Sequence, residues 1–275
     1  MNFIKRFFIF PAFLAACALI LPSSAALCGE AVIKVISPSE IGEFAAPDNS
    51  VDDDTYGYRA DPKGKCYHFK AFVSDGDSQW DVFFHYEEQF TATSTLKPIK
   101  NITYGPENLR NSVRGGGDRD DVWCEGVKGY GIGERVNMRV ITQAWHDRDD
   151  EIYFTALMLV NGHSKNETTW KNNSRVKILR LYVGGKPWCD LKLEDTIKPQ
   201  IFDFGDDERI YPSKSGIEYP EQDAFTRSLE PEYAIPKGPV YQTDLSFEII
   251  EVYPGAKYDD TCITGIALDV YGDIY

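Results

Sequence analysis

Alternation of apolar and polar residues is the main pattern along this chain. The segment RVNMRVIT, residues 135–142, alternates the two kinds, and IYFTALMLV, VKILRLYV, LSFEIIEVY and ITGIALDVY are further apolar-rich runs of strand length. Period-two alternation is typical of strands with one buried face. No segment offers a convincing long amphipathic helix, and turn-rich loops separate the runs. The pattern therefore predicts an all-β protein, either a sandwich or a barrel.

Further elements are predicted around these strands. The run AVIKVI, residues 31–36, predicts a first strand, and residues 66–90 have the pattern of a hairpin around turn residues 74–77. The apolar pairs Ile178-Leu179 and Ile249-Ile250 change the phase of the alternation, as bulges or burial on both faces would. Residues 205–238 are polar, rich in proline and without a strand period, so they are interpreted as an insertion.

A glycine-rich stretch, CEGVKGYGIGERV at residues 124–136, looks like a phosphate-binding loop. A dinucleotide fingerprint needs G-x-G-x-x-G followed by a helix. Here Glu134 stands at the position of the third glycine, and the residues after it alternate as a strand does. We therefore interpret the glycines as a tight turn that enters a half-buried strand.

The net charge of the chain limits the classes of partner that it can bind. The 275 residues carry a formal net charge of -14, with 43% hydrophobic residues. This acidity repels polyanions, so no nucleic-acid partner is expected. It is better suited to a neutral ligand, a cationic ligand or a bound divalent metal.

The N-terminus has the features of a targeting segment. Lys5 and Arg6 precede an apolar run, and small residues follow it, which predicts a signal peptide over residues 1–26 and secretion or a cell-envelope location. The alternative is a lipoprotein, because LAAC at residues 14–17 resembles a lipoprotein box and would attach the protein to a membrane through lipidated Cys17.

Export would place the remaining cysteines in an oxidising compartment, where disulfides form. They are Cys28, Cys66, Cys124, Cys189 and Cys262. Five is an odd number, so at least one bridge and one remaining thiol are expected. The connectivity stays open, and a Cys28–Cys66 bridge is the first hypothesis because it would tether the N-terminal extension.

Several ordered motifs resemble one family. They are TATSTLKPIKNITYGPENLRN, DDVWCEGVKGYGIGE, VNGHSKNETTWKNNSRVKILRLYVGGKPW, LKLEDTIKPQIFDF and EIIEVYPGAKYDDTCITGIALDV. Together they resemble the discoidin-like, coagulation-factor C type fold, in the branch of NADase-type glycan-binding domains of exported bacterial proteins. The resemblance implies a discoidin-like or galactose-binding-like jelly-roll β-sandwich over residues 89–275, with an N-terminal β extension at 27–88. It also implies a non-catalytic protein whose partner is a glycan; the oligomeric state is left open.

The loop from Asn161 to Arg175 is the best ligand candidate, because loops on a rigid scaffold often carry function. Its aromatic, amide and charged side chains suit a sugar, whose C–H face stacks on a ring while its hydroxyls bond planar groups. The predicted ligand-binding set is Asn161, His163, Lys165, Trp170, Asn173 and Arg175, with Trp145 from another turn. The alternative is that these residues anchor the loop and that Trp170 packs against the sandwich.

A metal site is a second candidate. The turn GGGDRDD, residues 115–121, carries Asp118, Asp120 and Asp121, which could hold a structural calcium as such turns often do in discoidin-like domains. The alternative is a solvated acidic turn, and the family's acidic residue near the final strand is missing, since Gly265 follows Thr264.

Two other functional classes remain beside glycan recognition. One is a structural or adhesion component that binds a protein partner. The other is a hydrolase, but the acidic pairs 120–121, 149–150 and 206–207 are adjacent in loops, whereas glycosidases need carboxyl groups on opposite sides of the bond. No nucleophile or zinc-protease motif occurs either.

Overall fold

The computed structural model describes residues 33–42, 83–111, 121–144, 151–205, 208–215 and 239–273. These residues belong to one compact unit that spans Ile33–Tyr275. Several predictions lie outside the described residues: the signal peptide, lipidation of Cys17, the Cys28–Cys66 bridge, the first strand of the 66–90 hairpin, and the placement of Trp145, Asp118 and Asp120.

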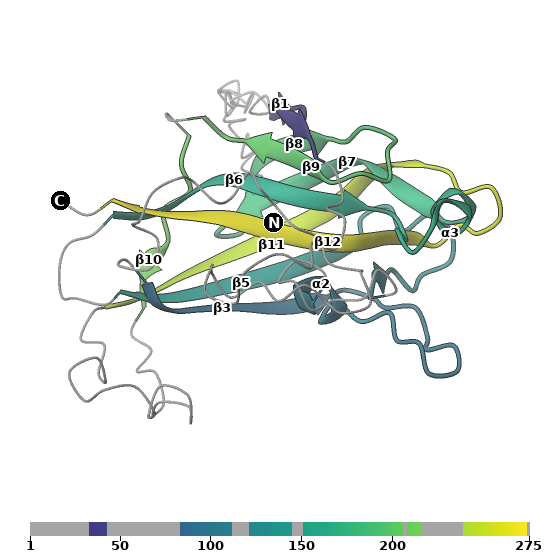
Figure 1. Ribbon diagram of the computed structural model, residues 1–275, viewed down its shortest axis with the longest axis horizontal. Helices are drawn as coiled ribbons and strands as arrows, with labels where there is room; N and C mark the ends of the chain where they lie inside the picture. Colours follow the sequence, from purple (N-terminus) through teal and green to yellow (C-terminus); the bar gives the residue numbers. More distant parts are fainter. Residues whose placement is uncertain are drawn as a thin grey trace, which may run out of the picture. The chain divides into compact units, whose positions relative to one another are not determined.

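Strands make up nearly all of the described regular structure (Figure 1). They are β1 (Lys34–Ile36), β2 (Glu40–Ile41), β3 (Phe83–Ala92), β4 (Trp123–Cys124), β5 (Arg135–Ala144), β6 (Glu151–Asn161), β7 (Ser174–Val183), β8 (Lys186–Lys192), β9 (Gln200–Asp203), β10 (Ser213–Lys214), β11 (Val240–Tyr253) and β12 (Thr261–Asp273). Two short helices, α2 (Asn108–Asn111) and α3 (Glu167–Asn172), lie between strands.

The strands form two layers that are continuous at one point. The order is β2-β9-β6-β12-β7-β11-β5-β3, with β8 on the other edge of β7. β12 and β7 meet only through the parallel pairs Thr261–Ser174 and Cys262–Arg175. Elsewhere β9, β6 and β12 form one layer, and β8, β7, β11, β5 and β3 form the other. The core draws on both layers, including Leu157 of β6 and Leu181 of β7, which are fully buried. The protein is a jelly-roll β-sandwich of the discoidin type.

Alternation explains the faces of β5 and β11. Val136, Met138 and Val140 of β5 point into the core. The residues between them pair across the other face: Arg139 Nε lies 2.8 Å from Asp244 Oδ1, and Arg135 Nη2 lies 2.8 Å from Glu248 Oε2. Both pairs are directly opposite each other in the β5–β11 register.

Both irregularities read from the sequence are confirmed. The pairing of β11 with β7 shifts register between Ile249 and Glu251, where the two apolar pairs meet. The glycine stretch is a turn in which Gly129, Gly131 and Gly133 have φ of 99°, 64° and 90°, and β5 begins two residues later.

Some elements were not predicted. β8 lies in a segment without clear alternation, and β9 is four residues long. The segment interpreted as an insertion contains the two-residue strand β10, which pairs with β11. Within the described ranges, no helix is long and apolar enough to cross a membrane.

Candidate ligand-binding site

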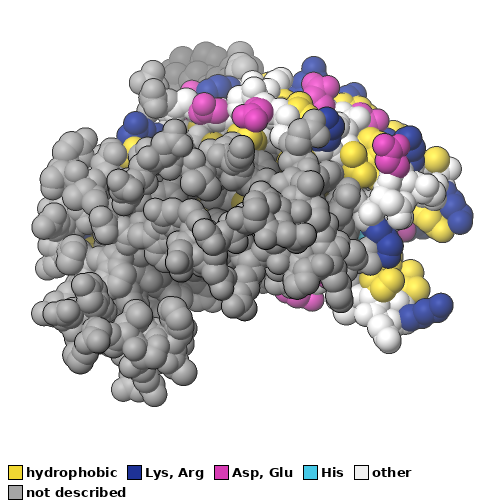
Figure 2. Space-filling model, in the orientation of Figure 1, with side chains coloured by type: hydrophobic (Ala, Val, Ile, Leu, Met, Phe, Trp, Pro, Cys, Tyr) yellow, Lys and Arg dark blue, Asp and Glu magenta, His cyan; other side chains and the backbone are white. Residues whose placement is uncertain are grey.

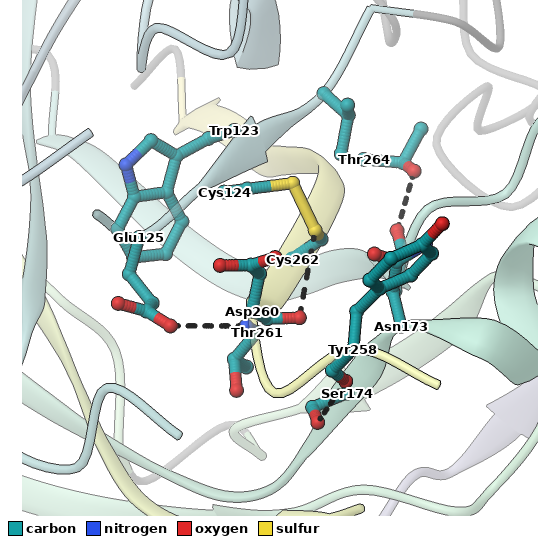
Figure 3. The surroundings of a disulfide bond; sticks show 12 residues. Trp123, Cys124, Glu125, Asn173, Ser174, Tyr258, Asp260, Thr261, Cys262 and Thr264 are labelled. Atoms are coloured by element: carbon teal, nitrogen blue, oxygen red, sulfur yellow. Dashed lines mark hydrogen bonds between the residues drawn. A yellow bond between two sulfur atoms is a disulfide. The ribbon is translucent and has the colours of Figure 1, made fainter. Parts of the chain in front are cut away.

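Three loops meet where β4 and β12 are joined by a disulfide between Cys124 and Cys262 (Figure 3). They are the β4–β5 loop (125–134), the β6–β7 loop that contains α3, and the β11–β12 loop (254–260). We call this region the loop end. The disulfide confirms that at least one bridge forms. Cys189, also described, is buried as a free thiol, and burial raises its pKa to about 12.

Helix α3 fixes the β6–β7 loop. Asn166 caps the helix by accepting a hydrogen bond from the Thr169 amide at 2.8 Å. Trp170 faces inward with 7% of its surface exposed, and its Nε1–H donates to the Asn161 carbonyl at 3.0 Å. Gly162 permits this approach, because a Cβ there would lie 2.7 Å from Trp170 Cδ1 and its φ is +75°. The indole in this structure is therefore part of the loop's packing.

The amide and guanidinium groups of the predicted set are engaged within the chain. Asn161 is buried, and its side-chain amide bonds both the N–H and the carbonyl of Val176 in β7. Asn173 donates to the Thr169 carbonyl at 2.9 Å. Arg175 donates to Asp195 from Nε at 2.9 Å and from Nη2 at 3.1 Å. These groups hold the loop on the sandwich; a contact between them and a ligand stays a prediction.

A polar and aromatic cluster gathers beside α3. The rings of Tyr104 and His163 lie edge to face, with centroids 6.5 Å apart. Burial raises the pKa of Tyr104, the charge of Asp260 raises it further, and Lys165 lowers it. His163 of the predicted set thus contacts the Tyr104 ring, and the charges of Lys165 and Asp260 act on the Tyr104 hydroxyl in opposite directions.

Two tyrosines project from the loops around that cluster. Tyr258 is 43% exposed, with the Lys257 ammonium 4.8 Å from its ring centroid, and Tyr130 is 39% exposed. Their backbones are fixed, since the Tyr258 carbonyl accepts from Ser174 Oγ at 3.2 Å and the Tyr130 carbonyl accepts from Thr261 Oγ1 at 2.8 Å. Exposed rings on anchored backbones give a pre-organised contact surface. We call Tyr104, Tyr130, His163, Lys165, Tyr258 and Asp260 the rim.

A buried carboxylate ties the β4–β5 loop to β12. Glu125 is fully buried, and its oxygens accept hydrogen bonds from the Val127 amide at 2.8 Å and the Thr261 amide at 3.2 Å (Figure 3). Burial raises the pKa of Glu125 despite these bonds. Burial, together with the charge of Asp259, also raises the pKa of Asp260.

An apolar tip extends from the rim. The turn at residues 99–102 closes through two hydrogen bonds between Ile99 and Ile102, and it sits beside the β4–β5 loop because the Leu96 amide donates to the Cys124 carbonyl at 2.9 Å. The tip comprises four exposed apolar residues and three exposed lysines: Ile99, Ile102, Val127, Ile132, Lys97, Lys100 and Lys128. Figure 2 shows hydrophobic and basic side chains together on the protrusion at lower right.

Sequence reasoning selected two of the residues that lie at the rim, His163 and Lys165, and ligand binding by them or by the loop that carries them stays a prediction. It missed Tyr104, Tyr130 and Tyr258, because their contribution depends on the disulfide that brings distant loops together. Of the calcium candidates, Asp121 is half-buried, and no group of three or more His, Cys, Asp or Glu side chains is arranged for a metal among the described residues.

Comparisons with known proteins agree with this architecture. The family model described as NAD glycohydrolase translocation F5/8 type C domain matches residues 85–269. No curated protein matches the chain.

Among solved structures, the chain is similar to the family 32 carbohydrate-binding module of Streptococcus pneumoniae EndoD, with 10% identity and a TM-score of 0.31, covering 65% of this chain and 94% of that one. It is also similar to a structure of the Streptococcus pneumoniae beta-galactosidase BgaA, with 9% identity and a TM-score of 0.30, covering 67% and 97%.

Proposed function

The chain belongs to the NAD glycohydrolase translocation F5/8 type C domain family, and from that premise we propose that it recognises carbohydrate through the rim. The observation that carries the proposal is the pair of exposed tyrosines, Tyr130 and Tyr258, whose backbones are anchored on two of the loops that meet at the disulfide. Tyrosine offers a flat apolar face and a hydroxyl at low cost in conformational entropy, which suits a sugar with a C–H face and hydroxyl edges.

The scaffold supports this reading. Five of the six rim residues lie on the three loops that are held by a disulfide, a buried carboxylate and a capped helix, and the sixth, Tyr104, accepts a hydrogen bond from the Cys124 amide at 3.3 Å through its carbonyl. A site fixed in this way loses little entropy on binding. Within it, the Trp170 group acts as support, and Tyr130 and Tyr258 supply the stacking faces.

Export and the absence of catalysis belong to the same proposal. Domains of this family are typically non-catalytic, and we infer the same of the whole chain. A disulfide is typical of an exported protein. The signal peptide at 1–26, with its lipidated Cys17 alternative, would deliver the protein to the cell envelope or beyond.

Removing the rings tests the proposal. We expect Tyr258→Ala and Tyr130→Ala to weaken glycan binding on an array by about tenfold or more, with the melting temperature nearly unchanged because both rings are exposed. The Phe variants should retain much of the binding, since they keep the ring. Lys192→Ala, an exposed change on β8, is the control. Unchanged binding in both Ala variants would place the site elsewhere.

The apolar tip favours a second candidate, adhesion to a protein partner. Ile99 and Ile132 are 54% and 57% exposed on adjacent loops, and exposed apolar patches mark interaction sites. In this case the wild-type protein would bind no glycan, and Ile99→Ser with Ile132→Ser would abolish attachment to the partner. Tyr258→Ala would leave that attachment intact.

A further inference from the structure

A polar cavity lies at the end of strand β11 that is opposite to the rim. It has a volume of about 330 Å³. Nine of the described residues line it: Val183, Gly184, Tyr211, Ser213, Lys214, Ser215, Gln242, Thr243 and Asp244. Figure 1 shows β10, which carries part of the lining, near the start of β11 and away from α3. Asp244 and Tyr253 are nine positions apart on β11, so the cavity and the rim are separated by about 30 Å of strand.

The cavity arises from a change of partner along one edge of β11. β5 occupies the other edge over Val240 to Glu248. On the edge away from β5, β10 pairs with β11 at Tyr241 and Gln242, whereas β7 pairs with β11 from Leu245 onward. The Gly184 amide closes the β7 side by donating to the Asp244 carbonyl at 3.0 Å. Thr243 therefore lies where neither β10 nor β7 pairs with this edge of β11, and the gap between these two strands is part of the sheet's topology.

The aromatic wall of the cavity is braced. Tyr211 is 54% exposed and leans on the buried ring of Tyr153, with centroids 5.9 Å apart at an angle of 55°. The Arg209 guanidinium lies 4.0 Å from the centroid of the Tyr153 ring. An open ring on a fixed support can stack against a ligand with little ordering cost.

On the polar wall of the cavity, hydrogen bonds orient the side chains, and the net charge is close to zero. Gln242 Nε2 donates to Asp244 Oδ2 at 3.2 Å, and Asp244 Oδ1 accepts from Arg139 Nε at 2.8 Å. The Asp244 charge is thereby compensated, and Lys214 is the one cation among the lining residues that the structure describes. Ser213 and Ser215, which also line the cavity, carry hydroxyls. Such a lining lacks the cation cluster that a phosphate or sulfate needs.

We propose that this cavity is a second saccharide site that takes a single neutral sugar ring. Its volume is at the lower end of the range for small-molecule sites, about 300–1,000 Å³. One ring face, one oriented amide and several hydroxyls match a polyol. The inference extends the proposed glycan recognition, because sites about 30 Å apart would let one chain engage two branches or two glycans with added avidity.

Amide NMR of the full chain separates the two sites. The probes are glucose, galactose, mannose and N-acetylglucosamine, with inorganic phosphate as the anionic probe. We expect at least one sugar to shift the amide signals of Gly184 and Gln242. Tyr211→Ala and Gln242→Leu should weaken that response by about tenfold. Tyr258→Ala should leave it unchanged while removing any shift at Thr261.

Each other result has a defined meaning. The second site is refuted if no sugar shifts Gly184 and Gln242, if those shifts persist in both cavity variants, or if only phosphate produces them. Gln242→Leu carries the test should Tyr211→Ala disturb Tyr153. A response at the cavity without one at Thr261 would refute the rim as a glycan site and leave the cavity intact. The converse would refute the cavity alone.

Discussion

The Arg175 guanidinium lies over the indole of Trp170, 4.5 Å from the ring centroid, while its Nε and Nη2 grip Asp195. Trp170 in turn bonds the Asn161 carbonyl. This stack of ring, cation and carboxylate fastens the α3 loop to β7. The residues that the sequence most favours as sugar contacts are thus, in the structure, groups that hold the rim in place.

Trp170→Ala should lower the free energy of unfolding by about 3–5 kcal/mol, the usual cost of emptying a buried tryptophan position. Glycan binding at the rim should fall only as far as the folded fraction falls. Trp170→Phe keeps most of the packing and loses the bond to the Asn161 carbonyl, so a loss of about 1 kcal/mol is expected. Thermal melting and array binding on the same samples check both. A stable Ala variant that cannot bind glycan would instead make Trp170 a contact residue.

Arg175→Lys keeps the charge and removes the planar fork that meets both oxygens of Asp195. Because Asp195 is 41% exposed, water screens the pair, and we expect a loss of about 1 kcal/mol in urea unfolding. Asp195→Asn should behave similarly, and the double variant should cost less than the sum of the two. Additive losses would show that the pair contributes nothing to stability.

How far the sequence predicts this fold depends on which force shapes each element. The sequence predicts β5 and β11 correctly, because one face of each strand is buried and the other carries cross-strand ion pairs. Apolar and polar residues therefore alternate along both strands. β9 left no such mark, since Gln200, Ile201 and Phe202 are all buried. Its pairing with β6 and β2 is set by tertiary contacts.

In the candidate site, too, some features follow from the local sequence and others depend on tertiary contacts. A Trp among Asn and Arg predicts a sugar site by composition, but exposure of the ring decides its role, and exposure depends on how Gly162 lets the indole fold under the loop. Likewise, the Cys124–Cys262 bridge spans 138 residues, and nothing local in the sequence selects that partner.

That bridge gives the third prediction. Replacing Cys124 and Cys262 together by Ala should lower the free energy of unfolding by about 2–5 kcal/mol, the usual effect of removing a native disulfide. The rim should be affected first, because β4 has only two residues and pairs only through this region of β12 in the described structure. Cys189→Ala is the matched control, since its thiol is buried and unbridged. A double variant that is as stable as the wild type, both with and without reductant, would contradict a structural role for the disulfide.

The last prediction concerns pH. Burial raises the pKa of Glu125 above 4.5, its value in an unfolded chain. Between that value and the raised one, the folded protein holds a proton that the unfolded chain has released, so the unfolding free energy falls as pH rises through the window. The cause is the cost of a charge in a fully buried position, only partly offset by the amides of Val127 and Thr261.

Glu125→Gln has no such titration. The unfolding free energy of the wild type should therefore decline relative to that of the variant as pH rises above 4.5, by about 1.4 kcal/mol for each unit of pKa shift. Asp260→Asn is the companion variant, because the pKa of Asp260 is also raised and its charge acts on Glu125. Denaturant unfolding across mildly acid to neutral pH measures both differences. Parallel stability curves for wild type and Glu125→Gln would mean that Glu125 titrates normally and contributes no pH dependence to the stability of the loop end.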